Sequence, residues 1–302
     1  RNGQTLAQVL NCVAGVEING SQSANGKNLG YYIRGGRNQQ VLIVIDGNPV
    51  TDPSGISFEF DLRLIPVDQI ESIEIMKGAA STLYGTGAAT AVINITTKSA
   101  GKKVLQGNGY MNIGSNNTAQ QSKINGQEFN QGFSANGTAH QVTYAAALNS
   151  TESGNMSQLA APAGQHYEAD RFSRLNLSGK LGWKASSKLR FDLFGSQDKI
   201  HNDYDQSFDN TGTGDTPLNT TTSKQERLGF APTFTYAKGE FKVNSAYTKI
   251  SRVYDEFNSW ANQMERSTYV GRSAVIDAFN KYSIRKDFFV IAGVNYQFHD
   301  MN

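Results

Sequence analysis

The sequence predicts an α+β domain of about 100 residues inside a transmembrane antiparallel β-barrel, of which about nine strands lie in this chain. Three observations lead to this fold class. Helix and strand signals alternate up to about residue 100, residues 104–302 show only strand-like alternation of apolar and polar side chains, and the connections between those runs alternate between short and long. We therefore assign residues 1–100 to the first domain and residues 104–302 to the N-terminal portion of the barrel.

Composition narrows the class of protein. The chain has 302 residues and a net charge of +2, which is too small to indicate a nucleic-acid partner. No run of 18 apolar residues is present, so the sequence predicts no transmembrane helix. A mean hydropathy of -0.46 is compatible with a membrane barrel, because barrel strands alternate apolar and polar residues.

The first 100 residues read as short helices and strands of a small mixed sheet. Residues 5–13 have helical spacing, and Cys12 lies on the apolar stripe of this helix, so we expect it in the core. Val41–Ile45 is apolar on both faces, as in a central strand. Asp46 and Gly47 then supply a turn. Further strands are predicted at residues 31–34, 70–76 and 92–96, with a helical turn at 66–69 and a short helix at 78–84.

The remaining chain repeats a period of two. Leu175, Leu177 and Leu181 alternate with polar residues, and the same pattern recurs near residues 189–194, 228–236 and 288–298. One face suits lipid and the other a wet or filled lumen. Short connections near residues 137–141, 185–188, 237–240 and 283–287 alternate with long polar ones at about 150–171, 198–224 and 255–266. Outer-membrane barrels have this asymmetry, whereas a soluble β-sandwich has no reason for it.

Size indicates that the barrel needs further strands. A barrel of about eight strands is filled by its own side chains, whereas plugged outer-membrane transporters have about 22. A domain of about 100 residues has a radius of gyration near 13 Å and does not fit the small barrel. We therefore expect the strand set to continue beyond Asn302.

An ordered series of motifs in the first domain resembles the plug of TonB-dependent outer-membrane receptors, most closely the cobalamin and siderophore branch. The series begins with Y-I-R-G-G at residues 32–36 and V-L-I-V-I-D-G at 41–47. It continues with I-E-S-I-E-I-M-K-G at 70–78, S-T-L-Y-G at 81–85 and A-V-I-N-I-T-T-K at 91–98. The resemblance covers about residues 1–100, and the barrel matches only in general character.

The resemblance implies a receptor in the cell outer membrane, in contact with its lipid, that takes up a scarce, bulky small-molecule ligand such as cobalamin or a ferric siderophore. It implies coupling to the TonB–ExbB–ExbD complex through a TonB box expected before Arg1. The alternative is a plugged barrel that interacts with other outer-membrane proteins as a subunit of a larger complex. The sequence shows no catalytic motif, so we predict no enzyme activity and no required cofactor.

By the same resemblance, the loops at residues 20–30 and 48–60 should face outward and the turn at 37–40 should face the periplasm. The ligand-contact candidates on the outward loops are Asn28, Asp52, Ser54, Ile56 and Phe58. Ordinary turn chemistry explains the same residues equally simply.

Two basic residues of the plug are predicted to latch it to the wall. Arg34 and Lys77 sit at strand ends in a domain enclosed by a barrel, where a charge must be paired or hydrated. In the family, such residues meet glutamates of the barrel wall, and we expect these partners beyond Asn302. Solvated strand ends are the alternative interpretation.

Asp203, Asp205 and Asp209 recur at even spacing in a predicted long loop. On an extended chain they would share one face, and carboxylate oxygens suit calcium. The sequence is therefore compatible with a calcium site in an extracellular loop. The simpler interpretation is an acidic, solvated loop. The histidines are scattered and show no metal-site spacing.

Overall fold

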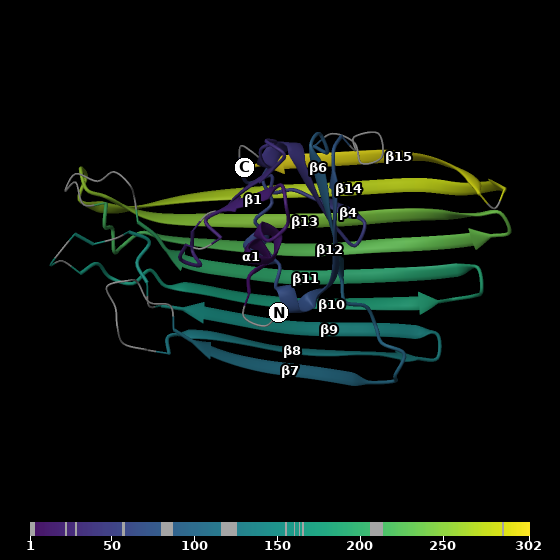
Figure 1. Cartoon of the computed structure of the whole chain (residues 1–302), viewed down its shortest axis with the longest axis horizontal. Helices are drawn as coiled ribbons and strands as arrows, with labels where there is room; N and C mark the ends of the chain where they lie inside the picture. Colours follow the sequence, from purple (N-terminus) through teal and green to yellow (C-terminus); the bar gives the residue numbers. More distant parts are fainter. Residues whose placement is uncertain are drawn as a thin grey trace.

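The computed structural model describes residues 4–21, 23–27, 29–55, 58–79, 87–115, 126–154, 156–159, 161–162, 164, 166–205, 214–285 and 287–302. In these residues a small α+β domain lies against one face of a long, curved antiparallel sheet (Figure 1). We call the small domain the plug and the long sheet the wall. No helix in this part of the chain is long and apolar enough to cross a membrane.

The plug begins with α1 (Leu6–Asn11), whose first turn is closed by a capping box between Thr5 and Gln8. The other described elements of the plug are short strands (β) and 3-10 helices (η). In chain order they are β1 (Val16–Asn19), β2 (Gly30–Ile33), η1 (Asn38–Gln40), β3 (Val41–Ile45), β4 (Asn48–Val50), η2 (Leu62–Leu64), η3 (Val67–Gln69), β5 (Ile70–Lys77) and β6 (Ala91–Thr97). Cys12 is exposed, so its expected place in the core is wrong.

Four plug strands form a mixed sheet in the order β4-β3-β6-β5, and β1 and β2 form a separate hairpin. Every residue of β3 is buried, which confirms the prediction of a central strand. The main apolar core comes from one face of β3 and β6 together with α1 and η2, and the opposite face forms a smaller cluster of Leu42, Val44, Ala88 and Val92. Asp46 and Gly47 both have positive φ, 52° and 82°, as a two-residue hairpin turn between β3 and β4 requires.

The wall contains nine strands in the described residues, each paired with its neighbours in sequence. They are β7 (Gln106–Gly114), β8 (Glu128–Ala139), β9 (Val142–Ser153), β10 (Phe172–Lys184), β11 (Leu189–Asp203), β12 (Thr220–Tyr236), β13 (Gly239–Asn258), β14 (Gln263–Arg285) and β15 (Phe288–Met301). The first and last strands each pair on one side only, so the sheet is open here.

Connections of the wall fall into two groups by end, as Figure 1 shows. The turns after β8, β10, β12 and β14 are short, whereas longer segments follow β7, β9 and β11. One expectation needs correction: the connection predicted near 255–266 is a tight turn, because β13 and β14 extend to Asn258 and start at Gln263. We call the two ends the short-turn end and the long-loop end.

Candidate functional site

The plug loop after β4 reaches the wall near its long-loop end. The Asp52 side chain is 1% exposed and forms an ion pair with Arg252 of β13. Its other carboxylate oxygen accepts a hydrogen bond from the Ser54 backbone N–H at 2.9 Å and another from the Ser54 hydroxyl. Asp52 therefore holds the loop in a turn and fastens it to the wall at once.

The residues predicted to contact the ligand differ in their exposure. Asp52 and Ser54 are buried, and their polar atoms are engaged by the loop itself and by Arg252. Phe58 is 46% exposed, and its ring meets that of His299 on β15 edge to face at 5.6 Å. Asn28 and Ile56 lie outside the described residues. Phe58 is thus the described candidate that still offers an open face to a ligand.

Three tyrosines that the sequence analysis did not single out lie beyond this loop. Tyr254 meets Tyr204 and Tyr269 edge to face at ring distances of 6.5 Å and 6.0 Å. Tyr254 lies two residues from Arg252, so both side chains point to the plug side of β13. The signal was present in the alternation of β13, but the last residues of the strand, from Asp255, were wrongly assigned to a long loop. We call Tyr204, Tyr254 and Tyr269 the tyrosine cluster.

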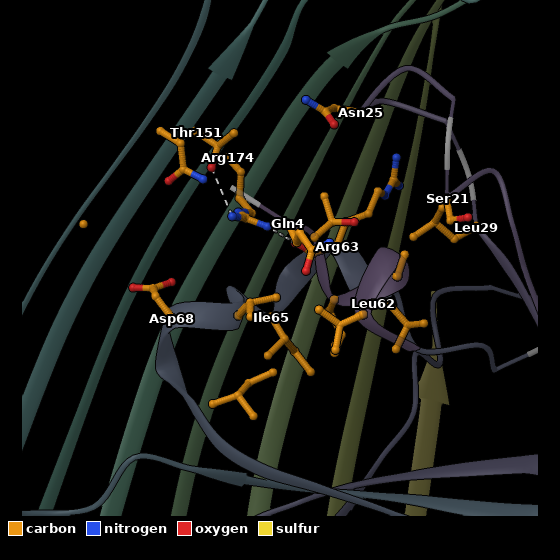
Figure 2. A pocket seen from close by; sticks show the side chains of 18 of the residues that line it. Gln4, Ser21, Asn25, Leu29, Leu62, Arg63, Ile65, Asp68, Thr151 and Arg174 are labelled. Atoms are coloured by element: carbon orange, nitrogen blue, oxygen red, sulfur yellow. Dashed lines mark hydrogen bonds between the residues drawn. The ribbon is translucent and has the colours of Figure 1, made fainter. Parts of the chain in front are cut away.

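A cavity of about 590 Å³ separates the plug from the first wall strands (Figure 2). Leu62, Ile65 and Asp68 line it from the plug, and Thr151 and Arg174 from the wall. Arg174 spans the gap: one guanidinium nitrogen donates to the backbone oxygen of Arg63 at 2.9 Å, and the other donates to the Thr151 hydroxyl at 3.0 Å. The space is therefore lined by both domains and bridged by a wall side chain.

The plug is fastened by its own acids to bases of the wall. In addition to the Asp52–Arg252 pair, Lys180 of β10 lies 2.9 Å from the Asp46 carboxylate. That carboxylate also accepts hydrogen bonds from the backbone N–H and hydroxyl of Thr97, at 2.9 Å and 2.8 Å. Asp46 thus ties the hairpin turn of the plug to β6 and to the wall.

The predicted latch residues Arg34 and Lys77 form contacts within the plug. Arg34 donates to the backbone oxygen of Lys77 at 3.4 Å, and the Lys77 ammonium donates to the backbone oxygen of Ala14. In the described part of the chain neither forms an ion pair with the wall. Arg34 and Lys77 therefore join β2, β5 and the segment before β1 within the plug, while their predicted latch to glutamates beyond Asn302 stays a prediction.

Acidic side chains do gather in the long loops, but not as the expected set. Carboxylate oxygens of Glu168, Asp205 and Asp215 lie within 4.8 Å of one another, which makes these three the described group that could hold a cation. The Asp203 carboxylate is not part of this group and accepts a hydrogen bond from the Arg171 backbone N–H at 3.2 Å. Asp209 lies outside the described residues. Three oxygens are half or fewer of the 6–8 ligands that calcium usually takes.

Burial shapes the protonation of this acidic group. Loss of hydration, followed by the hydrogen bond with Asp215, raises the pKa of Glu168 to about 7. Burial likewise raises the pKa of Asp170 to about 6, with the charges of Asp205 and Asp203 adding to the effect. Part of the cluster is therefore protonated near neutral pH, when no cation is bound.

Comparisons with known proteins agree with this architecture. Residues 1–92 match the family model described as the TonB-dependent receptor plug domain. The ferric enterobactin receptor of Pseudomonas aeruginosa is 33% identical over 142 residues, which is 44% of this chain and 18% of that protein. The vitamin B12 transporter BtuB of Vibrio vulnificus is 38% identical over 98 residues, covering 32% of this chain and 15% of the transporter.

Solved structures extend the likeness to the wall. The siderophore receptor PirA from Acinetobacter baumannii superposes with a TM-score of 0.77 at 19% identity, over 99% of this chain and 46% of that one. The copper transporter OprC superposes with a TM-score of 0.75 at 14% identity, over 98% of this chain and 42% of the transporter. The chain thus spans less than half of these structures, and at this identity the likeness concerns the fold.

A mixed-sheet plug seated against a long antiparallel wall defines a plugged outer-membrane β-barrel protein. The plug motifs and the family match specify it further: this chain carries the plug domain and part of the barrel of a TonB-dependent receptor.

Proposed function

We propose that this chain belongs to a receptor that takes up a bulky solute across the outer membrane at the expense of energy supplied through TonB. The observation that carries the proposal is the plug itself, which is fastened to the wall by ion pairs at Asp46 and Asp52. A plug held by a few polar contacts closes the barrel and can still be displaced by a pulling force. A passive pore has no use for such a domain.

The solute class we propose is a ferric siderophore or a cobalamin. Relatives in sequence are named as receptors for ferric enterobactin and as a transporter of vitamin B12. In this chain the tyrosine cluster and Phe58 present aromatic surface at the long-loop end, near the cation of Arg252. Aromatic faces suit a large, planar solute.

Uptake by cells that carry the full-length protein tests this function. With radiolabelled ferric enterobactin and cobalamin as probes, we expect accumulation of one of the two, abolished by a protonophore and by loss of TonB. Tyr254→Ala together with Tyr269→Ala should weaken binding of that solute about tenfold or more, because each buried aromatic contact contributes on the order of 1 kcal/mol.

Tyr247→Ala is the matched control, because Tyr247 lies on the same strand but points away from the plug and is 46% exposed. Energy-independent uptake of both probes would contradict the proposal. Failure to accumulate either probe, combined with stoichiometric co-purification of another outer-membrane protein, would instead favour a plugged subunit of a larger complex.

A further inference from the structure

The outer face of the wall carries two pairs of like charges placed directly opposite each other. Lys199 of β11 faces Lys224 of β12, and Lys249 of β13 faces Arg272 of β14. Like charges at directly opposed positions of an antiparallel sheet destabilise it. We call these four residues the basic band. Nothing in the packing of the plug requires them, so the band needs a reason of its own.

The basic band points away from the plug. Its residues alternate along their strands with side chains that are buried against the plug or turned toward it, such as Ile200, Ile250 and Ser273. Successive side chains of a strand point to opposite faces. The band therefore lies on the surface that a barrel presents to its membrane.

Its own acids neutralise the band only in part. Glu226 lies 2.6 Å from Lys224, and Asp300 lies 3.1 Å from Arg272. Lys199 and Lys249 form no ion pair within 4.0 Å among the described residues, although Glu226 also lies directly opposite Lys249. The band has four positive charges and these two carboxylates offset two of them, so its net charge is +2. Both pairs are close to half-exposed, and exposed pairs contribute little.

Below the band, Glu226 is the last charged side chain on the outer face of β12, and the outward positions beyond it are free of charge. The outward positions toward the short-turn end on β12, β13 and β14 are apolar or uncharged: Leu228, Phe230, Pro232, Phe234, Tyr247, Ser245, Val243, Phe241, Ala274, Ile276, Ala278 and Asn280. The change from cations to this surface is abrupt. It marks the edge of the region in contact with hydrocarbon.

The distance from the basic band to the lower part of this uncharged surface fits a bilayer. Phe234 follows Lys224 by ten residues on β12, which is roughly 34 Å of strand at about 3.4 Å per residue. At a strand tilt of about 40°, this length spans roughly 26 Å, close to the apolar band of about 25 Å in outer-membrane barrels. The basic band therefore lies at the level of the headgroups of the leaflet at the long-loop end.

We propose that the basic band is a binding site for the phosphate groups of a phosphorylated lipid in that leaflet. A phosphate placed between the opposed cations converts their repulsion into charge-assisted hydrogen bonds. The guanidinium of Arg272 adds a planar fork suited to two phosphate oxygens, while the lysines act as point charges. The acyl chains of such a lipid would cover the uncharged surface below. This assignment is independent of the transported solute.

Native mass spectrometry of the full-length protein in detergent tests the site. The probe is a lipid A carrying two phosphates, compared with the same lipid after dephosphorylation. We expect the wild type to retain the phosphorylated form at least about tenfold better than a variant with Lys199→Gln, Lys224→Gln, Lys249→Gln and Arg272→Gln, since each basic residue near a charged surface contributes measurably to binding.

The control variant removes four lysines near the short-turn end, with Lys103→Gln, Lys184→Gln, Lys188→Gln and Lys238→Gln. It should retain the lipid as the wild type does. Equal retention by the basic-band variant, equal loss in the control, or equal binding of the dephosphorylated lipid would each overturn the proposal. Competition by millimolar inorganic phosphate alone, with no preference for the lipid, would also overturn it.

Thermal unfolding supplies a second readout that does not depend on lipid detection. Without lipid, the basic-band variant should unfold at the same temperature as the wild type or higher, because two like-charge pairs are relieved. Phosphorylated lipid should raise the unfolding temperature of the wild type and leave that of the variant unchanged. Stabilisation of both proteins alike would contradict the assignment.

Discussion

At the scale of single residues, the structure gives several charged side chains contacts that the sequence did not predict. Asp52 is an anchor to Arg252, whereas Arg34 and Lys77 hold parts of the plug together. The residue types were informative, since a charge enclosed by a barrel had to be paired. The partner could not be read from the sequence, because pairing depends on which strand of the wall faces which loop of the plug.

The acidic loop cluster gives a pH dependence with a definite sign. The pKa of Glu168 is raised to about 7 and that of Asp170 to about 6. The folded loops therefore bind more protons than the unfolded chain between about pH 4 and 7, so their stability is highest below this window and falls as the pH rises through it. Hydrogen exchange of the Gln158 amide, which donates to Asp170 at 2.5 Å, should become faster relative to its intrinsic rate from pH 5 to pH 8.

Glu168→Gln should flatten this pH response, because it removes one titrating group from the cluster. If the three carboxylates at Glu168, Asp205 and Asp215 bind calcium, millimolar calcium should restore protection at pH 8 in the wild type and not in the variant. A pH-independent exchange rate would contradict the assigned protonation.

At the scale of elements, the sequence predicted most of the fold and misplaced some ends. The apolar run of β3 and the alternation of β10 to β12 identify strands from local pattern alone. The outer parts of β13 and β14 are polar, so they looked like a long loop. Pairing with neighbours along their whole length gives them their structure, and a local pattern does not contain that information.

The contact between the plug loop and β14 depends on a glycine. A Cβ at Gly271 would lie 2.4 Å from the backbone nitrogen of Ser54 and 2.7 Å from the carbonyl carbon of Pro53. Since both neighbours are backbone atoms, Gly271→Ala should displace the loop and weaken the Asp52–Arg252 pair, at a cost of about 1–3 kcal/mol. Faster proteolysis of the loop at residues 52–55 and a lower unfolding temperature are the expected results.

Gly55→Ala is the control within the same loop, since a Cβ there meets nothing within 4 Å. It should leave both measurements close to those of the wild type. Equal behaviour of the two variants would show that close approach at Gly271 does not position the loop.

At the scale of the whole molecule, the ion pairs between the plug and the wall have the same polarity, with the acid on the plug and the base on the wall. Acids of the plug, Asp46 and Asp52, face bases of the wall, Lys180 and Arg252. The polar face of β10 was visible in the sequence as the residues that alternate with its leucines. What the sequence could not supply was the seating of the plug, because that requires the curvature of the sheet and the path of every plug loop.

This seating predicts which substitutions make the barrel leak. Asp46→Asn combined with Asp52→Asn removes the carboxylate partners of two partly buried wall cations, Lys180 and Arg252. Removing one member of a fully buried pair costs about 3–5 kcal/mol, and partial exposure of these cations reduces that cost. In planar bilayers the full-length double variant should show channel openings at lower urea concentrations than the wild type. Arg34→Ala combined with Lys77→Ala should weaken the plug internally without opening it at its seam with the wall, so its openings should begin at wild-type urea concentrations. Leakage from the Arg34 and Lys77 variant alone would mean that the basic residues of the plug hold it to the wall after all. Leakage from the aspartate variant alone would establish that the plug is retained by its acids, and that a pulling force has to break these pairs before a solute can pass.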